Sequence, residues 1–294
     1  MMQHPFFWPT KTLILDDNER YLDEMKQLLS NDAEFIFCSD SKEAQQLINN
    51  QGYNFNWFSK SLNYRGYGQE SYDIDYKSIH SAIYDNKRRD IISTILIDYH
   101  MPLISGIDFC NSISPELGVR KILLTANMGY QNAVENLNNN AIHGFLSKQD
   151  ITLGTIMATL KRENSIFFKN HSIFLNKCIK LSNNNHPIFY QDYTNHFNNL
   201  IEQYKIKEYY LLNELGWYLL VDNNNRKYYL FIFSEEEMQE MIEEARLRGI
   251  EPSLYNSLKT YSKALCYYNS TNSGWPLLCA KHTSPLKMNL RQAY

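Results

Sequence analysis

Thr94-Ile-Leu-Ile-Asp98-Tyr-His-Met-Pro102-Leu-Ile-Ser-Gly106 is the most informative stretch of this sequence. A short apolar run ends at the carboxylate Asp98 and is interrupted by Met101-Pro102. After Gly106 the apolar residues recur with helical spacing, which predicts a buried strand followed by a helix. In open α/β sheets, sites for ions and phosphates lie at the carboxyl ends of strands. A single strand-terminal aspartate is more often a turn residue or a helix cap, so the assignment depends on the rest of the chain.

The same alternation of strand and helix recurs on both sides of this stretch. We expect strands at 12–15, 34–38, 94–98, 121–125 and 144–148, and helices marked by apolar residues within 22–29, 44–48, 107–113, 133–137 and 153–160. This order predicts an α/β fold with a five-stranded, parallel, doubly wound sheet. Its strand ends meet at one edge and bring together Asp16, Asp17, Asp98, Thr125 and Lys148.

These residues resemble the receiver domain of two-component response regulators, which has a flavodoxin-like, CheY-like fold. The resemblance covers roughly residues 11 to 163. It rests on Asp16-Asp17, Asp98-x-x-Met101-Pro102-x-x-x-Gly106, Thr125-Ala126 and Gly144-Phe145-x-x-Lys148. One departure is Gln149, which stands where the family usually has proline.

The resemblance implies a phospho-acceptor site. A carboxylate attacks a phosphoryl group poorly because two anions repel each other, so a divalent cation and a lysine are needed. Asp98 would accept the phosphoryl group. Mg²⁺, which prefers oxygen ligands, would be held by Asp17, Asp98 and the backbone carbonyl of His100, with Asp16 acting through water. Lys148 and Thr125 would contact phosphoryl oxygens, and Phe145 would be the coupled aromatic switch.

Other interpretations exist for each residue taken alone. An Asp-Asp pair is often a solvated turn, a strand-terminal lysine is usually a surface charge, Thr125 could cap a helix and Phe145 could be core. Phosphohydrolases with an aspartyl intermediate also use a strand-end aspartate. They need a second acid two positions later, where this sequence has His100.

A long insertion precedes the strand that ends at Asp98. Asp17 and Asp98 are 81 positions apart, whereas two average strand-helix units would take about 50. We assign the extra residues to 49–89, which include clusters around Tyr53–Phe58, Tyr64–Tyr67 and Tyr72–Tyr76. Such aromatic residues suit a partner surface, although packing of the loop on its own domain is an equal alternative.

Domain boundaries follow from changes in pattern. We expect an N-terminal tail at 1–10, the receiver at 11–163 and a helical connector at 164–207. The connector's apolar stripe runs from Phe189 through Tyr193 and Phe197 to Tyr204, and it would pack as core or dimerise. A smaller α+β output domain would occupy 208–294. It would contain strands at 209–212, 217–221 and 228–233 and a hairpin turn at 222–226. A helix capped by Ser234 would follow, and another from Pro252 would include Leu254, Leu258 and Leu265.

The output region lacks a helix-turn-helix pattern and an evident catalytic set. Segments 210–222 and 234–238, with 82–88 before the phospho-acceptor strand, resemble response regulators without a DNA-binding module. Some members of that group accompany quorum-sensing kinases.

Composition favours a cytoplasmic protein and gives no sign of nucleic-acid binding. The 294 residues are 44% hydrophobic with a net charge of −3, and no basic run stands out. Five scattered cysteines form no Cys-x-x-Cys pair, which suggests reduced thiols. No signal peptide or membrane span is expected.

The sequence therefore predicts a response regulator whose phosphoryl donor is a sensor histidine kinase or a phosphotransfer protein. Phosphorylation would change homodimerisation or the binding of a downstream protein partner, and the receiver itself would not be an enzyme beyond its own dephosphorylation. Two alternatives remain: a ligand-binding or enzymatic output domain gated by phosphorylation, and an unconventional DNA-binding regulator.

Overall fold

A computed structural model describes residues 4–29, 34–50, 62–65, 71–126, 137, 139, 141–183, 186–233, 235–259, 263–265, 277–279 and 287–293. The chain divides into two compact units. The parallel-sheet unit consists of Trp8–Leu62 and Ser81–Phe174, and the antiparallel-sheet unit of Met1–Phe7, Asn63–His80 and Leu175–Tyr294.

The parallel-sheet unit has the predicted doubly wound fold. Its strands are β2 (Lys11–Leu15), β3 (Phe35–Cys38), β6 (Ile92–Asp98), β7 (Arg120–Thr125) and β8 (Gly144–Ser147). They are parallel and ordered β3-β2-β6-β7-β8. The helices α1 (Glu19–Leu28), α2 (Ser41–Asn50) and α5 (Gly106–Ser112) belong to the same unit, as does the first part of α7 (Leu153–Ser182). The five-stranded receiver-type fold is therefore confirmed.

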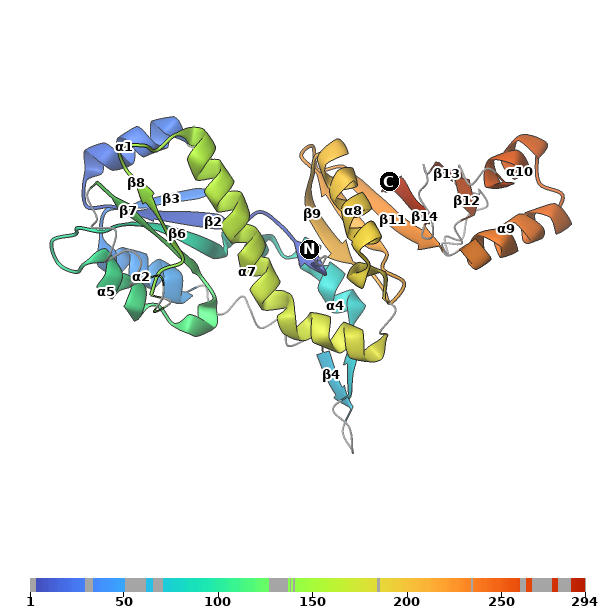
Figure 1. Ribbon diagram of the computed structural model, residues 1–294, viewed down its shortest axis with the longest axis horizontal. Coiled ribbons are helices and arrows are strands. Elements are labelled where there is room, and N and C mark those ends of the chain that lie inside the picture. Colours follow the sequence, from blue (N-terminus) through green and yellow to red (C-terminus); the bar gives the residue numbers. More distant parts are fainter. Residues whose placement is uncertain are drawn as a thin grey trace. The chain divides into compact units, whose positions relative to one another are not determined.

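Two apolar layers sandwich this sheet. Figure 1 shows α1 and α7 on one face and α2 and α5 on the other. Alternate residues of β2 serve both layers, as period-two side chains must: Ile14 packs with α1 and α7, whereas Leu13 and Leu15 pack with α2 and α5. The middle strands are buried on both faces, which explains why β6 has an uninterrupted apolar run, Ile95-Leu96-Ile97, before Asp98.

One predicted helix of this unit cannot be checked in full. It was expected around 133–137, and apart from Leu137 its residues lie outside those the structure describes.

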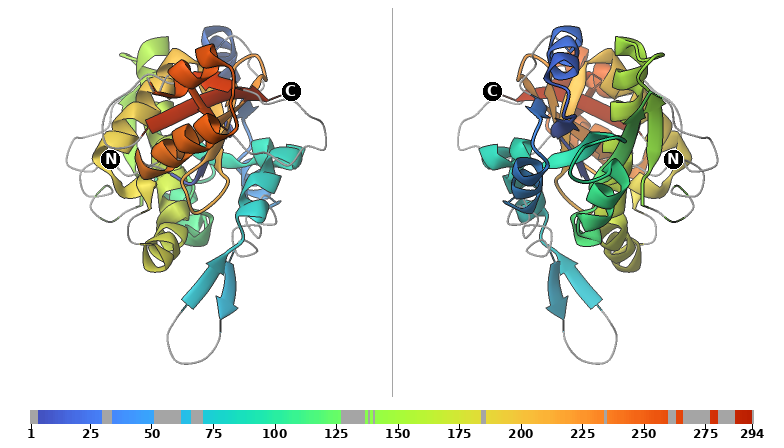
Figure 2. Two further views of the ribbon diagram at one scale, coloured as in Figure 1. Left: turned by 90° about the vertical axis from the view of Figure 1, so that its right-hand side faces the viewer. Right: turned by 90° about the vertical axis from the view of Figure 1, so that its left-hand side faces the viewer.

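The insertion contributes a strand pair and short helices. β4 (Leu62–Arg65) and β5 (Ser71–Ile74) form a two-stranded sheet, visible as the adjacent cyan strands in Figure 2. They are followed by α4 (Tyr76–Ser81) and by 3₁₀ turns η2 (Ala82–Tyr84) and η3 (Asn86–Asp90). Asn63–His80 cluster with the antiparallel-sheet unit, so the insertion is not simply a loop of the parallel-sheet unit. The predicted cluster Tyr53–Phe58 lies outside the described residues.

The antiparallel sheet begins at the N-terminus, in the segment expected to be a tail. β1 (Phe6–Phe7) pairs with β9 (Ile206–Leu211), and the sheet continues through β10 (Tyr218–Asp222), β11 (Lys227–Phe233) and β14 (Lys287–Ala293). Phe6 is fully buried, and Phe7 stacks on Tyr209 with ring centroids 5.5 Å apart. Two aromatic side chains therefore fix a strand too short to show a period in the sequence.

The region expected as a connector is likewise part of larger elements. Its first residues continue α7, which runs for 30 residues. After the turn η5 (Pro187–Phe189), α8 (Gln191–Gln203) begins. Phe197 of α8 contacts Tyr209 and Tyr218 at centroid distances of 5.1 and 4.8 Å. The apolar stripe of α8 thus packs as core of the antiparallel-sheet unit.

The remaining elements follow the predicted order with shifted limits. Asp222 accepts hydrogen bonds from the backbone N–H groups of Asn224 and Arg226 at 2.9 and 2.8 Å, which closes the expected hairpin. The helix α9 spans Glu235–Leu247, while the predicted cap Ser234 lies outside the described residues. The helix from Pro252, α10 (Pro252–Lys259), is shorter than predicted, because Leu265 lies in β12 (Lys263–Leu265), which pairs with β13 (Leu277–Cys279). Among the described helices, none is long and apolar enough to cross a bilayer.

Candidate functional site

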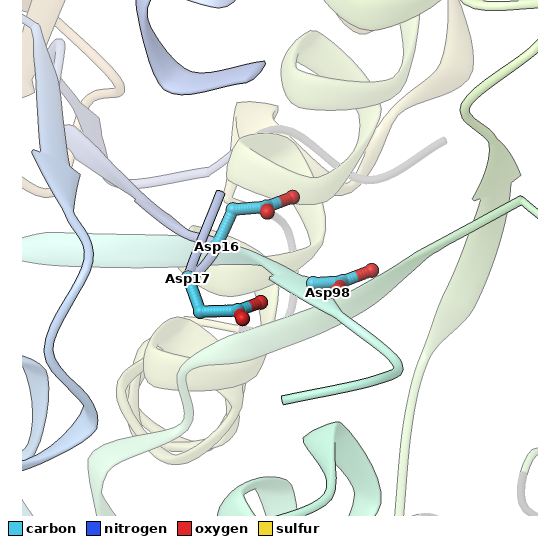
Figure 3. Close-up of side chains that lie close together, drawn as sticks. All are labelled: Asp16, Asp17 and Asp98. Carbon is cyan, nitrogen blue, oxygen red and sulfur yellow. The ribbon is translucent and has the colours of Figure 1, made fainter. Parts of the chain in front are cut away.

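Three aspartates meet where two neighbouring parallel strands end. Asp16 and Asp17 directly follow β2, and Asp98 is the last residue of β6. One carboxylate oxygen from each lies within 4.8 Å of the others, and Figure 3 shows the three carboxyl groups turned to the same side. Asp16 and Asp98 are buried, whereas Asp17 is exposed, so the cluster is accessible from one side.

Local capping orients Asp16. The backbone N–H of Asn18 donates to Asp16 Oδ1 at 3.0 Å. The Asn18 side chain caps α1 by accepting from the backbone N–H of Tyr21 at 3.2 Å. The acidic turn and the first turn of α1 are therefore held together by hydrogen bonds.

Lys148 bridges two of the carboxylates. It directly follows β8, and its Nζ lies 2.6 Å from Asp16 Oδ2 and 2.8 Å from Asp98 Oδ1. Burial alone would lower the pKa of Lys148, but the hydrogen bonds to Asp16 and Asp98 outweigh it and raise that pKa. Burial raises the pKa of Asp16, although Lys148 and the Asn18 N–H oppose the shift. The lysine thus stays charged and offsets part of the repulsion between the acids.

A glycine places the chain after Asp98. Gly106, the first residue of α5, donates its N–H to the carbonyl of Tyr99 at 3.0 Å. A Cβ at this position would lie 2.2 Å from the carbonyl oxygen of Asp98. The backbone of α5 therefore approaches β6 more closely than any residue with a side chain would allow.

The other predicted site residues lie at or near the same sheet edge. Thr125 is buried at the end of β7, and its carbonyl accepts from the Lys148 N–H at 2.8 Å. Phe145 lies in β8 with 41% of its surface exposed. His100 is exposed two positions after Asp98.

One residue of the site was not predicted. The ring of Tyr21, in the first turn of α1, lies under the Lys148 ammonium, with Nζ 4.4 Å from its centroid. An aromatic residue four positions after an acidic pair, on a capped helix, was the only sequence signal available.

The donor set fits a small, hard cation. All three groups are carboxylates, the ligands that Mg²⁺ prefers, and Mg²⁺ usually binds one or two of them together with water. Because both oxygens of Asp16 already accept hydrogen bonds, Asp17 and Asp98 are the better direct ligands.

Comparison with known proteins gives structural matches only. No protein-family model matches the chain, and no curated protein matches it in sequence. The structure of the Legionella pneumophila response regulator LqsR matches with a TM-score of 0.72 at 21% identity, over 99% of this chain and 91% of that one. Vibrio cholerae CheY4 and a CheY-like receiver domain from Methanospirillum hungatei match at 17% identity, over 52% and 55% of this chain and 98% of theirs. Their TM-scores of 0.33 and 0.38 are too low to carry weight.

The chain thus has the fold of LqsR over almost its whole length. At 21% identity this likeness establishes the fold and not the activity. The predicted resemblance to response regulators with a receiver domain is confirmed at that level.

Proposed function

We propose that this protein is a response regulator of a two-component system, with Asp98 as the phospho-acceptor. The observation that carries the proposal is Lys148, which bridges Asp16 and Asp98 beside Asp17 at the edge of a receiver-type sheet. The likeness to LqsR, a response regulator by its description, supports it. A sensor histidine kinase or a phosphotransfer protein would be the donor.

In the proposed reaction, an Asp98 carboxylate oxygen attacks the phosphorus of a phosphohistidine. A phosphorus–oxygen bond forms as the phosphorus–nitrogen bond breaks, and the imidazole leaves with the electron pair. Mg²⁺, held by Asp17, Asp98 and the His100 carbonyl, would supply positive charge that offsets the repulsion between the two anions.

The protein's own groups do the positioning. Lys148 already lies within 2.8 Å of Asp98, so it is placed to follow the new negative charge onto a phosphoryl oxygen. The Thr125 hydroxyl would donate to another oxygen. Phe145, exposed at the neighbouring strand, would move inward and change the surface presented to partners.

The consequence for the rest of the chain is also part of the proposal. We infer that the parallel-sheet unit is the receiver and the antiparallel-sheet unit the output. Phosphorylation would switch homodimerisation or the binding of a protein partner in the cytoplasm. A role in quorum sensing rests on the resemblance of segments 210–222, 234–238 and 82–88 alone.

Intact-mass spectrometry tests the acceptor. The full chain is incubated with acetyl phosphate and MgCl₂, and the wild type is expected to gain one phosphoryl group while Asp98→Asn gains none. Asp23→Asn, an exposed acid on α1 that pairs with Lys26, serves as the matched control and should still be modified. Wild-type protein that stays unmodified both with acetyl phosphate and with a phosphorylated phosphotransfer protein would overturn the proposal. Size-exclusion chromatography of the modified sample reports dimerisation.

A further inference from the structure

The ammonium of Lys148 contacts two carboxylates and one aromatic ring. A lysine ammonium carries three donors, and two carboxylates, Asp16 and Asp98, lie within 2.8 Å of this one. The ring of Tyr21 lies 4.4 Å away, well inside the range of about 6 Å for a cation–π contact. Only 17% of the Lys148 side chain is exposed, which strengthens such a contact because little water competes.

The position of the Tyr21 ring is fixed by the acidic turn itself. The backbone N–H of Tyr21 donates to the Asn18 side chain, and the backbone N–H of Asn18 donates to the Asp16 carboxylate. The Tyr21 side chain also packs against the apolar cluster between α1, α7 and the sheet, to which Leu22 and Leu124 belong. The aromatic face is therefore placed relative to Asp16 and is not a freely moving surface side chain.

The Tyr21 hydroxyl does not explain this placement. Within the described part of the chain, its oxygen is buried and makes no hydrogen bond. Burial, followed by the nearby charges of Asp16 and Asp98, raises the pKa of Tyr21, so the phenol stays neutral. The ring face is the part of the side chain that meets the lysine.

We propose that Tyr21 is a positioning residue of the phospho-acceptor site, whose ring holds the Lys148 ammonium over the pocket while its anionic partner changes from the Asp98 carboxylate to the phosphoryl group. This inference rests on the proposed function. In the resting site, Lys148 is held by two anions and a ring. When Asp98 becomes an acyl phosphate, the negative charge moves from its carboxylate to the phosphoryl oxygens. Lys148 must shift toward these oxygens, while Asp16 and the Tyr21 ring stay in place as its fixed anchors.

Three variants of the full chain separate ring, hydroxyl and stability. Tyr21→Phe keeps the ring, and Tyr21→Leu removes it while keeping an apolar side chain. Met25→Ala truncates another residue of α1 that is 2% exposed and packs in the same apolar layer. It serves as a control for loss of stability without a change at Lys148.

The first measurement is the binding of beryllium trifluoride, a phosphoryl mimic, with Mg²⁺ present. Tyr21→Leu is expected to weaken this binding roughly 3- to 30-fold, the size of a partly buried cation–π contact. Tyr21→Phe and Met25→Ala should stay within about twofold of wild type. The Mg²⁺ dissociation constant should change by less than about twofold in all three, because the ring touches the lysine and not the metal ligands. A purely structural role would weaken both ligands or would be reproduced by Met25→Ala.

The second measurement does not depend on phosphoryl chemistry. In protein labelled with ¹³C-lysine, the Lys148 Cε–H signals, assigned with Lys148→Met, should show an upfield ring-current shift in wild type and Tyr21→Phe that Tyr21→Leu loses. A Lys148 signal unchanged in Tyr21→Leu, or beryllium trifluoride binding that Tyr21→Phe weakens as much as Tyr21→Leu, would overturn the inference. If wild type binds no beryllium trifluoride, the proposed function fails, and the lysine signal still decides whether the ring holds Lys148.

Discussion

Gly106→Ala tests whether close packing of α5 on β6 sets the geometry of the acidic site. The new methyl group would lie 2.2 Å from the Asp98 carbonyl oxygen and 3.1 Å from Leu123 Cδ2. Ordinary contacts are about 3.5 Å, so β6 and the start of α5 must separate by about 1 Å. Overpacking of this kind costs about 1–3 kcal/mol. Stretching the hydrogen bond from Gly106 to Tyr99 adds about 1 kcal/mol.

We therefore expect Gly106→Ala to destabilise the parallel-sheet unit by about 2–4 kcal/mol. Because the chain has two compact units, a single unfolding curve would mix them. Hydrogen exchange followed by mass spectrometry, read on peptides covering β6 and α5, resolves the free energy of opening locally. The Mg²⁺ dissociation constant of the same variant should rise, since Asp98 moves with its carbonyl.

Gly154→Ala is the matched control. Among the described residues, a Cβ at Gly154, in the first turn of α7, would meet only Thr152 Oγ1, at 3.8 Å. Alanine should be neutral or stabilise that helix by up to about 1 kcal/mol. A loss below about 0.5 kcal/mol in Gly106→Ala, or equal behaviour of the two variants, would refute the packing argument.

Three further predictions concern acid, metal and backbone strain. Burial lowers the pKa of His171 and His186 to about 4, so between pH 6.5 and 4 the unfolded chain binds protons that the folded chain does not. The free energy of unfolding should be intact above pH 6.5 and fall below it, by up to about 3 kcal/mol per histidine. A pH series of hydrogen exchange measures this loss, and an unchanged free energy down to pH 4.5 would contradict the prediction. MgCl₂ at about 100 times its dissociation constant should stabilise the parallel-sheet unit by about 2.7 kcal/mol, and Asp17→Asn should need far more MgCl₂ for the same protection. Gly118→Ala combines a φ of 61° with a Cβ 2.7 Å from His171 Nε2, so it should lower the free energy of unfolding by about 2–4 kcal/mol. Gly249→Ala has a φ of 62° but meets no described atom within 4 Å, so it should cost only about 1 kcal/mol. Equal losses in local hydrogen exchange would show that the contact with His171 does not matter.

The acidic site could be predicted because its residues sit at strand ends. In a parallel sheet the carboxyl ends share one edge, so Asp16, Asp98 and Lys148 converge once the strands are recognised, whatever the loop lengths between them. The ion pairs at 2.6 and 2.8 Å agree with that argument. Tyr21 could not be placed in this way, because its role depends on a helix rotation and a lysine rotamer that no period in the sequence encodes.

The fold was harder to predict wherever pairing is non-local. Phe6–Phe7 is a strand of two residues, and only its partners Tyr209 and Tyr210 make it one. Leu265 follows a helical pattern but pairs with Leu277 in a strand. In both cases the deciding contact is far along the chain, and local spacing either gives no signal or favours the wrong element.

The division of the chain has a consequence for how the two units work. The polypeptide passes from one unit to the other four times, after Phe7, Leu62, His80 and Phe174. The units are therefore joined by four covalent connections and not by one linker. A fragment covering residues 11–163 would carry Asn63–His80 away from the unit to which they belong, and it would also remove β1 from its sheet. The insertion precedes β6, the strand that ends in Asp98, and its last part leads directly into that strand. The two units are therefore connected through the segment that precedes β6 as well as through the helix α7, whereas a tandem arrangement would have a single connection.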